Sequence, residues 1–411
     1  MNNSSPIEKY LCLLLLLLCV PARQTAYAQA NDEKTEFEKF KKAQAQGVRD
    51  QSAAFQQYKE TVTKQYDEYV KEQERLFKEY TGRIEKLWGT KKLQVSMKKE
   101  YVSYDSSFAS RRSIDFEKGT ARVEVLVTER QAQDRAFVND ALRNQVEKIV
   151  TSKGGEDPLE KKTNTAPEPK PLLDGQIRTT AGAPVTETNA ARFADQAVQS
   201  FSVKQQTVVG ADGVKRVVIG VQLPLVPDHL KKRASEFRSR VRTEAVRFAI
   251  DPSLVFAVMH TESYFNPMAR SSVPAYGLMQ LVPKSGARDA YLFVNKRDSL
   301  VSGEYLFIPG NNIELGTAYL AKLLTVDFAS IRDPKSRMYC AIAAYNTGPG
   351  NVAKCFSGKR NVKSAVPKIN AMSSDEVFDH LKKNLPFAET RNYISTVSSR
   401  MGLYNEWSTD H

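Results

Sequence analysis

The first regular pattern of apolar residues covers residues 37–88, where aromatic and aliphatic side chains recur every three or four positions among Lys, Glu and Gln. This spacing places them on one face of a helix. The pattern predicts one long amphipathic helix, with an interruption near Gly47. We expect its apolar face to pack against a second copy, the next domain, a cell-wall protein or a membrane surface. The apolar positions are Phe55, Tyr58, Val62, Tyr66, Tyr69, Leu76, Tyr80, Ile84 and Leu87.

Beyond Trp88 the apolar pattern changes from helical spacing to alternation, which is typical of strands. Residues 113–127 alternate on either side of the turn sequence Glu117-Lys118-Gly119. Residues 207–223 do the same around Ala211-Asp212-Gly213. Each segment predicts a β-hairpin.

The segment between the hairpins is mixed. Residues 130–150 carry apolar side chains at helical spacing and predict a helix. Residues 156–170 contain three prolines and many charges, which predicts a surface loop or a disordered insert. We interpret residues 29–225 as an accessory domain, a long helix to about residue 88 followed by a small α+β unit without a catalytic constellation.

Helical patterns dominate after Pro224 and Pro227, and residues 226–411 are interpreted as a second, mainly helical domain. The overall fold class is therefore predicted to be α+β. Asn311-Asn312 is expected to cap one of the helices. The predicted helices cover residues 228–248, 252–265, 315–324, 336–345, 374–381 and 390–401.

Glu262 is the most informative residue of this second domain. It follows an apolar run, residues 254–259, and Asp251-Pro252 is a good helix start because Asp caps and Pro suits the first turn. Asn266-Pro267 is a good stop. Glu262 should therefore lie in the last turn of an apolar helix, where burial raises the pKa of a carboxyl and suits it to general acid catalysis. The alternative is a structural Glu paired with a nearby Arg.

The chain begins with features of an export signal. Residues 11–20 form an apolar run too short to span a bilayer, and Ala26-Tyr27-Ala28 follows as a cleavage site. This predicts a signal peptide of residues 1–28 and an exported, periplasmic protein. An uncleaved anchor and membrane association by lipid attachment at Cys19 are the alternatives, although the large Leu18 fits a lipid-attachment site poorly.

The chain is basic, with 60 Lys and Arg against 47 Asp and Glu and a formal net charge of +13. An exported basic protein favours an anionic polymer or surface, such as cell-wall glycan or anionic lipid. A solvated basic surface without a specific partner is the alternative. Nucleic acid is not expected as a partner in that compartment.

Two of the four cysteines, Cys340 and Cys355, lie outside the predicted signal peptide. An even pair in an oxidising compartment is compatible with a disulfide. Cys340 also lies in an apolar helix, where a free buried thiol is common. No Cys or His spacing suggests a metal site.

Four segments around Glu262 form an ordered set, supported by Phe265-Asn266-Pro267 and residues 316–321. They resemble the lytic transglycosylases of the goose-type lysozyme-like superfamily, and a motif set in order is far more specific than any one member. Within it the chain looks most like membrane-bound lytic murein transglycosylase C, a resemblance that extends to the 101–127 hairpin. The four segments are Glu262-Ser263, Gly277-Leu278-Met279-Gln280, Ala343-Ala344-Tyr345-Asn346-Thr347-Gly348 and Glu389-Thr390-Arg391-Asn392-Tyr393-Ile394.

The resemblance implies a lysozyme-like catalytic domain in which Glu262 is the only acid and base. It implies that Ser263 holds its surroundings by hydrogen bonds and that the hydroxyl of Tyr393 reaches the carboxyl. From the residues alone, Ser263 could cap the helix end and Tyr393 could be a core aromatic with a satisfied hydroxyl.

The resemblance also implies contacts with the substrate. Met279 and Gln280 would line a sugar groove, and Tyr345 and Asn346 would lie near the acid and the substrate. Singly, Met279 could fill the core, Gln280 could serve a turn and Tyr345 could be a core aromatic.

Ordinary glycosidases use two carboxyl groups, and no second one stands out in the four segments. One acid suffices if the substrate supplies the nucleophile, as the C6 hydroxyl of N-acetylmuramic acid can. The family resemblance thus implies cleavage of peptidoglycan strands without water, metal or cofactor, leaving 1,6-anhydromuramoyl ends. A hydrolytic muramidase with Asp289 or Asp298 as base, and a non-catalytic wall-binding scaffold, are the alternatives.

Overall fold

The computed structural model describes residues 63–162, 170–271 and 274–407, together with residues 39, 46, 57, 60 and 61. The predicted signal peptide, including Cys19, and the predicted interruption near Gly47 lie outside these residues. The chain divides into a unit of residues 1–69 and a unit of residues 70–411, and the second unit is described below. Within the described part, no helix has the length and apolar character needed to cross a membrane.

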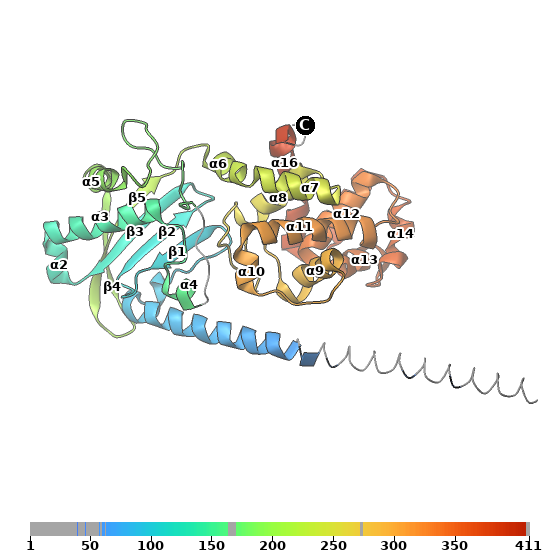
Figure 1. Cartoon of the computed structure of the whole chain (residues 1–411), viewed down its shortest axis with the longest axis horizontal. Coiled ribbons are helices and arrows are strands. Elements are labelled where there is room, and N and C mark those ends of the chain that lie inside the picture. Colours follow the sequence, from blue (N-terminus) through green and yellow to red (C-terminus); the bar gives the residue numbers. More distant parts are fainter. Residues whose placement is uncertain are drawn as a thin grey trace, which may run out of the picture. The chain divides into compact units, whose positions relative to one another are not determined.

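The N-terminal helix is continuous from residue 63 to residue 88 (blue in Figure 1). Its apolar positions Leu76, Tyr80 and Ile84 are buried together with Trp88, in a cluster with strand residues such as Tyr104. The predicted packing face is therefore confirmed for these positions, and its partner is the following domain. Gly89 ends the helix with a positive φ of 79°, and a Cβ there would collide with the carbonyl oxygen of Val209, so glycine suits this position.

A five-stranded antiparallel sheet follows, with the order β1-β2-β3-β5-β4. Both predicted hairpins, β2–β3 and β4–β5, are confirmed. They join through pairing of β3 with β5, in which Val123 lies opposite Val221. The strands are β1 (Glu100–Tyr104), β2 (Ser110–Asp115), β3 (Thr120–Val127), β4 (Val203–Val209) and β5 (Lys215–Pro224).

The two faces of the sheet are covered differently because successive side chains of a strand point to opposite faces. Tyr101 packs with helices on one face, whereas Val102 packs with the N-terminal helix on the other. The predicted 130–150 helix is broken at Asp134, whose side chain accepts a hydrogen bond from the Phe137 amide. The helices of the first face are α2 (Glu129–Gln133), α3 (Arg135–Thr151) and α5 (Ala190–Ser200).

The predicted loop of residues 156–170 is wrong in its first part. Residues Pro158–Lys162 form a short helix, α4, and residues 163–169 lie outside the described part. Leu159 is buried, and Asp157 is held by the hydroxyl of Tyr80 at 2.8 Å. At least one charged residue of this segment, Asp157, is therefore buried inside the protein, which the composition alone could not show.

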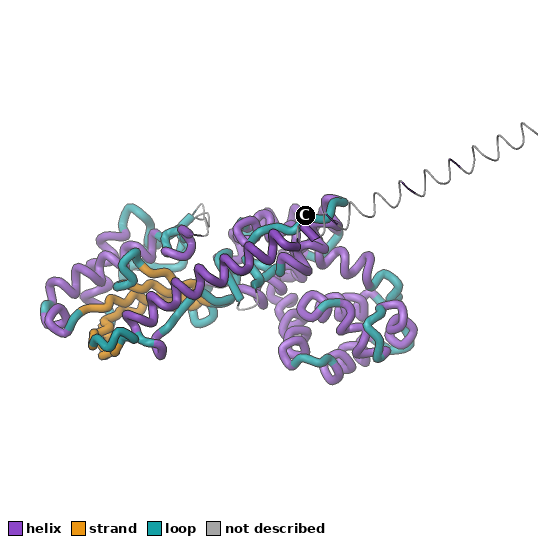
Figure 2. The backbone as a smooth tube through the Cα atoms, turned by 90° about the horizontal axis from the view of Figure 1, so that it is seen from below, coloured by secondary structure: helices purple, strands orange, loops and turns teal. Residues whose placement is uncertain are grey.

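Helices make up the rest of the described chain, and strands are confined to the accessory sheet (Figure 2). The α+β fold class is thus confirmed. The predicted 228–248 helix is broken at Phe237, and Asn311-Asn312 does not cap the start of its helix, which begins at Pro309 after Ile308. The helices are α6 (His229–Glu236), α7 (Arg238–Phe248), α8 (Pro252–Ser263), α9 (Arg288–Asn295), α10 (Gly303–Phe307), α11 (Pro309–Lys322), α12 (Pro334–Thr347), α13 (Pro349–Ser357), α14 (Val362–Ile369), α15 (Ser374–Asn384) and α16 (Ala388–Met401).

Candidate functional site

Helix α8 carries Glu262 in its last turn, as its sequence predicts. Asp251 caps the start, with its carboxylate accepting from the Ser253 amide at 2.8 Å. The helix ends sooner than Asn266-Pro267, because Tyr264 and Phe265 adopt left-handed backbone conformations with φ of 52° and 59°. Almost every residue of α8 is buried, and Glu262 itself is 5% exposed.

Burial raises the pKa of Glu262 above its ordinary value, which confirms the predicted direction. The largest opposing effect comes from Lys98, whose Nζ lies 3.4 Å from Oε2 of the carboxyl. The predicted alternative of an Arg partner is wrong, since the charged partner is Lys98, from the segment that precedes β1. Glu389 adds a smaller effect that raises the pKa of Glu262.

Glu262 opens onto a groove of about 630 Å³ that is exposed to solvent. Its wall combines residues of the 271–286 segment with residues of α11, α12, α13 and α16. The lining residues are Lys98, Glu262, Ser271, Ala275, Gln280, Leu281, Val282, Ser285, Gly286, Tyr319, Tyr345, Asn346, Thr347, Gly348, Asn351, Phe387, Glu389 and Thr390.

Two of the predicted residues fasten the end of α8 to the segment that follows it. The hydroxyl of Ser263 lies 3.0 Å from the carbonyl oxygen of Met259 and 2.7 Å from that of Leu278. The amide of Gln280 donates to the carbonyl oxygens of Ala269 and Gly277, each at 3.0 Å. Ser263 is fully buried, whereas Gln280 also lines the groove.

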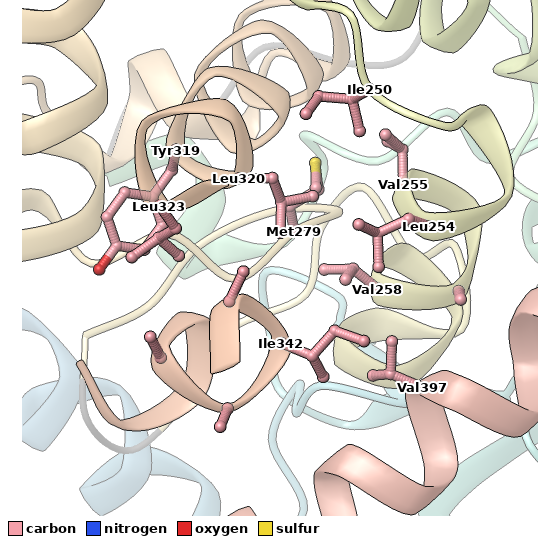
Figure 3. Close-up of a cluster of buried hydrophobic side chains, with 14 of the residues drawn as sticks. Ile250, Leu254, Val255, Val258, Met279, Tyr319, Leu320, Leu323, Ile342 and Val397 are labelled. Carbon is pink, nitrogen blue, oxygen red and sulfur yellow. The ribbon is translucent and has the colours of Figure 1, made fainter. Parts of the chain in front are cut away.

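Met279 does not line the groove, contrary to the prediction. Its side chain is completely buried in the core between α8 and α11, where Figure 3 shows it beside Leu320. Its backbone is held from both sides: its amide donates to Asn312 Oδ1 and its carbonyl oxygen accepts from the Tyr345 hydroxyl, both at 2.8 Å. Gly316 provides room for the thioether, since a Cβ there would collide with the sulfur of Met279.

Tyr345 and Asn346 both line the groove, as the motif predicts. The Asn346 carboxamide oxygen accepts a hydrogen bond of 2.6 Å from the Thr390 hydroxyl, which joins α12 to α16. The hydroxyl of Tyr393 is buried without an ordinary hydrogen-bond partner. It is near enough to Glu262 for a weak interaction that lowers the pKa of the carboxyl.

Sequence reasoning missed several residues of the groove, namely Lys98, Tyr319, Phe387 and Glu389. Glu389 stands in the fourth motif, so it could have been noticed. Lys98 carried no local pattern that links it to Glu262. The two aspartates considered as a second base lie away from the groove, where Asp298 pairs with Arg288 at 2.6 Å and Asp289 with Lys322 at 3.2 Å.

The cysteine pair is not a disulfide: Cys340 and Cys355 are both free thiols. Burial raises the pKa of both, to about 11 for Cys355. The alternative of a buried free thiol therefore holds for Cys340. Among the residues that the structure covers, no group of three or more His, Cys, Asp or Glu could hold a metal ion.

Two family models match this chain. The model described as the transglycosylase SLT domain matches residues 239–366, and that of the membrane-bound lytic murein transglycosylase C N-terminal domain matches residues 59–236. Among solved structures, the 70 kDa soluble lytic transglycosylase from Escherichia coli is 25% identical with a TM-score of 0.33, covering 44% of this chain and 26% of that chain.

Full-length relatives extend the similarity over both domains. Membrane-bound lytic murein transglycosylase C from Yersinia enterocolitica is 36% identical over 335 residues, which is 80% of this chain and 88% of that protein. The protein of the same name from Klebsiella pneumoniae is 35% identical over 335 residues, with the same coverage. The chain therefore belongs to the membrane-bound lytic murein transglycosylase C family of lytic transglycosylases.

Proposed function

We propose that this lytic transglycosylase cleaves the β-1,4 bond between N-acetylmuramic acid and N-acetylglucosamine in peptidoglycan without consuming water. Glu262 acts as its only general acid and base. One observation carries the proposal: a carboxyl group, 5% exposed and with a raised pKa, faces a groove that is large and open. Such a group can still hold a proton when it meets a glycosidic oxygen.

In the first step the protonated Glu262 donates its proton to O4 of N-acetylglucosamine as the C1–O4 bond breaks. Positive charge develops on C1 and O5 of the muramic acid ring, and the neighbouring N-acetyl carbonyl oxygen can stabilise it. Glu262 is left as a carboxylate.

In the second step the C6 hydroxyl of the same muramic acid attacks C1, and the carboxylate of Glu262 takes the hydroxyl proton. The C1–O6 bond forms, the 1,6-anhydro ring closes and Glu262 regains its proton. Because nucleophile and acceptor belong to one sugar, the attack has a high effective molarity and needs no second carboxylate.

A hydrolytic muramidase is the competing function, and Glu389 is the one residue of the described groove that favours it. Its side chain is 74% exposed and lies 3.7 Å from Lys98 Nζ. A base that activates water must be held in a fixed position. The exposed Glu389 is not held in this way, whereas the C6 hydroxyl is held near C1 by the sugar ring itself, which supports the intramolecular mechanism.

The other groove residues have assisting roles in this proposal. Gln280, Tyr345 and Asn346 would contact the sugars, while Ser263 and Tyr393 would orient the acid. The effect of Met279 would pass through its backbone, since its side chain is buried.

We propose residues 226–411 as the catalytic domain and residues 29–225 as an accessory domain that positions it at the wall. Export to the periplasm through residues 1–28 fits the substrate. The relatives' name, membrane-bound, supports association with the membrane, with Cys19 as the disfavoured attachment point.

The decisive experiment is mass analysis of the products from purified sacculi digested by the full chain. We expect muropeptides with anhydro ends. Each is lighter than the corresponding reducing product by one water, about 18 Da. Reducing muramic acid ends instead would overturn the non-hydrolytic mechanism and favour the muramidase.

A further inference from the structure

The segment between the N-terminal helix and β1 brings a lysine to the catalytic carboxyl. Met97 and Glu100 exchange backbone hydrogen bonds of 2.9 and 3.3 Å, which form a tight turn with Lys98 and Lys99 at its tip. Both lysines reach toward the catalytic domain but take different partners. Lys99 binds Glu117 at 2.7 Å and lies over the ring of Tyr264.

Lys98 lies between the two carboxyl groups of the groove. Its Nζ is 3.4 Å from Glu262 Oε2 and 3.7 Å from Glu389 Oε1, and its side chain is 35% exposed. The two carboxyls therefore share one ammonium group. The pairing joins a turn of the accessory domain to the end of α8 and the start of α16.

Few other charged or titratable groups act on Glu262. From α16 the Tyr393 hydroxyl lowers the pKa of the carboxyl, and Glu389 raises it. From α12, the phenol of Tyr345 has a pKa raised by burial and then by the nearby charge of Glu262. His260, on the same helix, bonds the Tyr404 hydroxyl at 2.9 Å, and burial lowers its pKa to about 3, so it is neutral. Lys98 is thus the cation that most strongly favours the ionised carboxyl.

We propose that Lys98 is a positioning residue of the active site, supplied by the accessory domain, and that its ammonium group stabilises the Glu262 carboxylate formed when the glycosidic bond breaks. Glu389 shares the same ammonium group, so the charge of Lys98 is divided between two carboxyl groups and Glu262 can still be protonated before the reaction. This inference rests on the proposed function, because it assigns Glu262 the role of proton donor.

The proposal makes a prediction about the pH profile with a definite sign. The kcat/KM of the free enzyme requires protonated Glu262, so activity falls as pH rises through the pKa of that carboxyl. Lys98 lowers this pKa, and its removal must raise it. Opposite charges at such distances shift a pKa by about 1–3 units, and a shared, partly exposed lysine should lie at the low end.

The test is the pH dependence of sacculus cleavage by the full chain carrying Lys98→Met. The descending limb of the kcat/KM profile should move upward by about one pH unit, and the maximal rate should fall about tenfold because the carboxylate loses its counter-charge. Lys98→Arg, which keeps the charge, should restore the parental limb. Lys118→Met is the matched control: it removes one charge from the same sheet, but Lys118 pairs with Asp115 at 2.8 Å and should leave the profile unchanged.

Glu389→Gln supplies an opposite expectation. Removing this carboxylate takes away a charge that raises the pKa of Glu262 and leaves Lys98 free to pair with Glu262 alone. The descending limb should move to lower pH, in the direction opposite to that expected for Lys98→Met. A loss of a hundredfold or more would instead indicate a catalytic base and support the muramidase.

A slower Lys98→Met enzyme whose descending limb coincides with that of the parent would overturn the proposal, because a structural role alone lowers the rate without moving the limb. The same digests report the product. If the products carry anhydro ends and the descending limb of Lys98→Met does not move, only the proposed role of Lys98 is refuted. If the parent protein yields reducing ends, the proposed function itself is refuted, whatever the result for Lys98.

Discussion

Two carboxyl groups, Glu262 at the end of α8 and Glu160 in α4, have raised pKa values, yet their surroundings differ. Burial is the first cause for both, and it raises the pKa of Glu160 to about 7. Glu262 faces a groove of about 630 Å³, whereas Glu160 faces a cavity of only about 40 Å³.

The partners of Glu160 are fixed groups of the protein. Its carboxyl accepts from the Tyr101 hydroxyl at 3.2 Å and from the Asp157 amide at 3.3 Å. Asp157 in turn accepts from the Tyr80 hydroxyl and the Tyr104 amide, both at 2.8 Å. These contacts tie α4 to the N-terminal helix and to the sheet.

The difference shows that a raised pKa does not by itself mark an active site. At Glu160 the hydrogen-bonding positions are occupied by the protein and no ligand of sugar size could enter. At Glu262 the carboxyl meets the partly exposed side chain of Lys98 and the open groove. Access to an open groove distinguishes Glu262, the proposed catalytic acid, from Glu160.

The largest expected effect is on activity and comes from Glu262→Gln. The amide keeps the shape of the carboxyl but cannot donate a proton, so turnover of sacculi should fall at least about a thousandfold. Binding to sacculi should persist, and thermal stability should be equal or higher because a buried acid is removed. If cells that carry this variant keep the same cell-wall integrity as cells with the parent protein, the non-catalytic scaffold would be favoured.

Glu160→Gln should change stability in place of activity. The folded state holds the Glu160 proton up to a pKa of about 7, against 4.5 for the free group, so the parent loses stability as pH rises between these values. The loss is at most roughly 3 kcal/mol, from about 1.4 kcal/mol per pKa unit.

The variant lacks this slope, which urea unfolding at pH 4.5 and pH 7.5 measures against the parent. Its turnover of sacculi should stay within about twofold of the parent, since surface and structural substitutions away from the groove act weakly. Parallel stability curves for the two proteins, or a large loss of turnover, would break the contrast between the two acids.

Tyr393→Phe should change the free energies of folding and catalysis least of the three variants, and it tests whether the Tyr393 hydroxyl assists Glu262. The hydroxyl has no ordinary hydrogen-bond partner, so its loss should leave the melting temperature unchanged or slightly higher. Turnover should fall about tenfold, because the hydroxyl helps to orient Glu262 and lowers its pKa. Full turnover in steady-state assays would show that the hydroxyl does not assist the acid.

Much of the fold follows from short-range patterns. The start of α8 at Asp251-Pro252, the two hairpins around their turn residues and the end of α12 at Gly348 were all predictable, because caps, turns and apolar periods act within a few residues. Predictions failed where distant parts meet. The joining of the hairpins through β3 and β5 and the burial of Asp157 depend on partners far away in the chain.

The candidate site divides in the same way. The sequence by itself determined the acid, its apolar helix and the motif residues, because each of these is encoded in a short stretch of chain. Only the tertiary structure decided that Met279 points into the core, that Cys340 stays a thiol and that Lys98 meets Glu262 across 164 residues. Packing and electrostatic contacts depend on which surfaces meet in space, and spacing along the chain does not encode that.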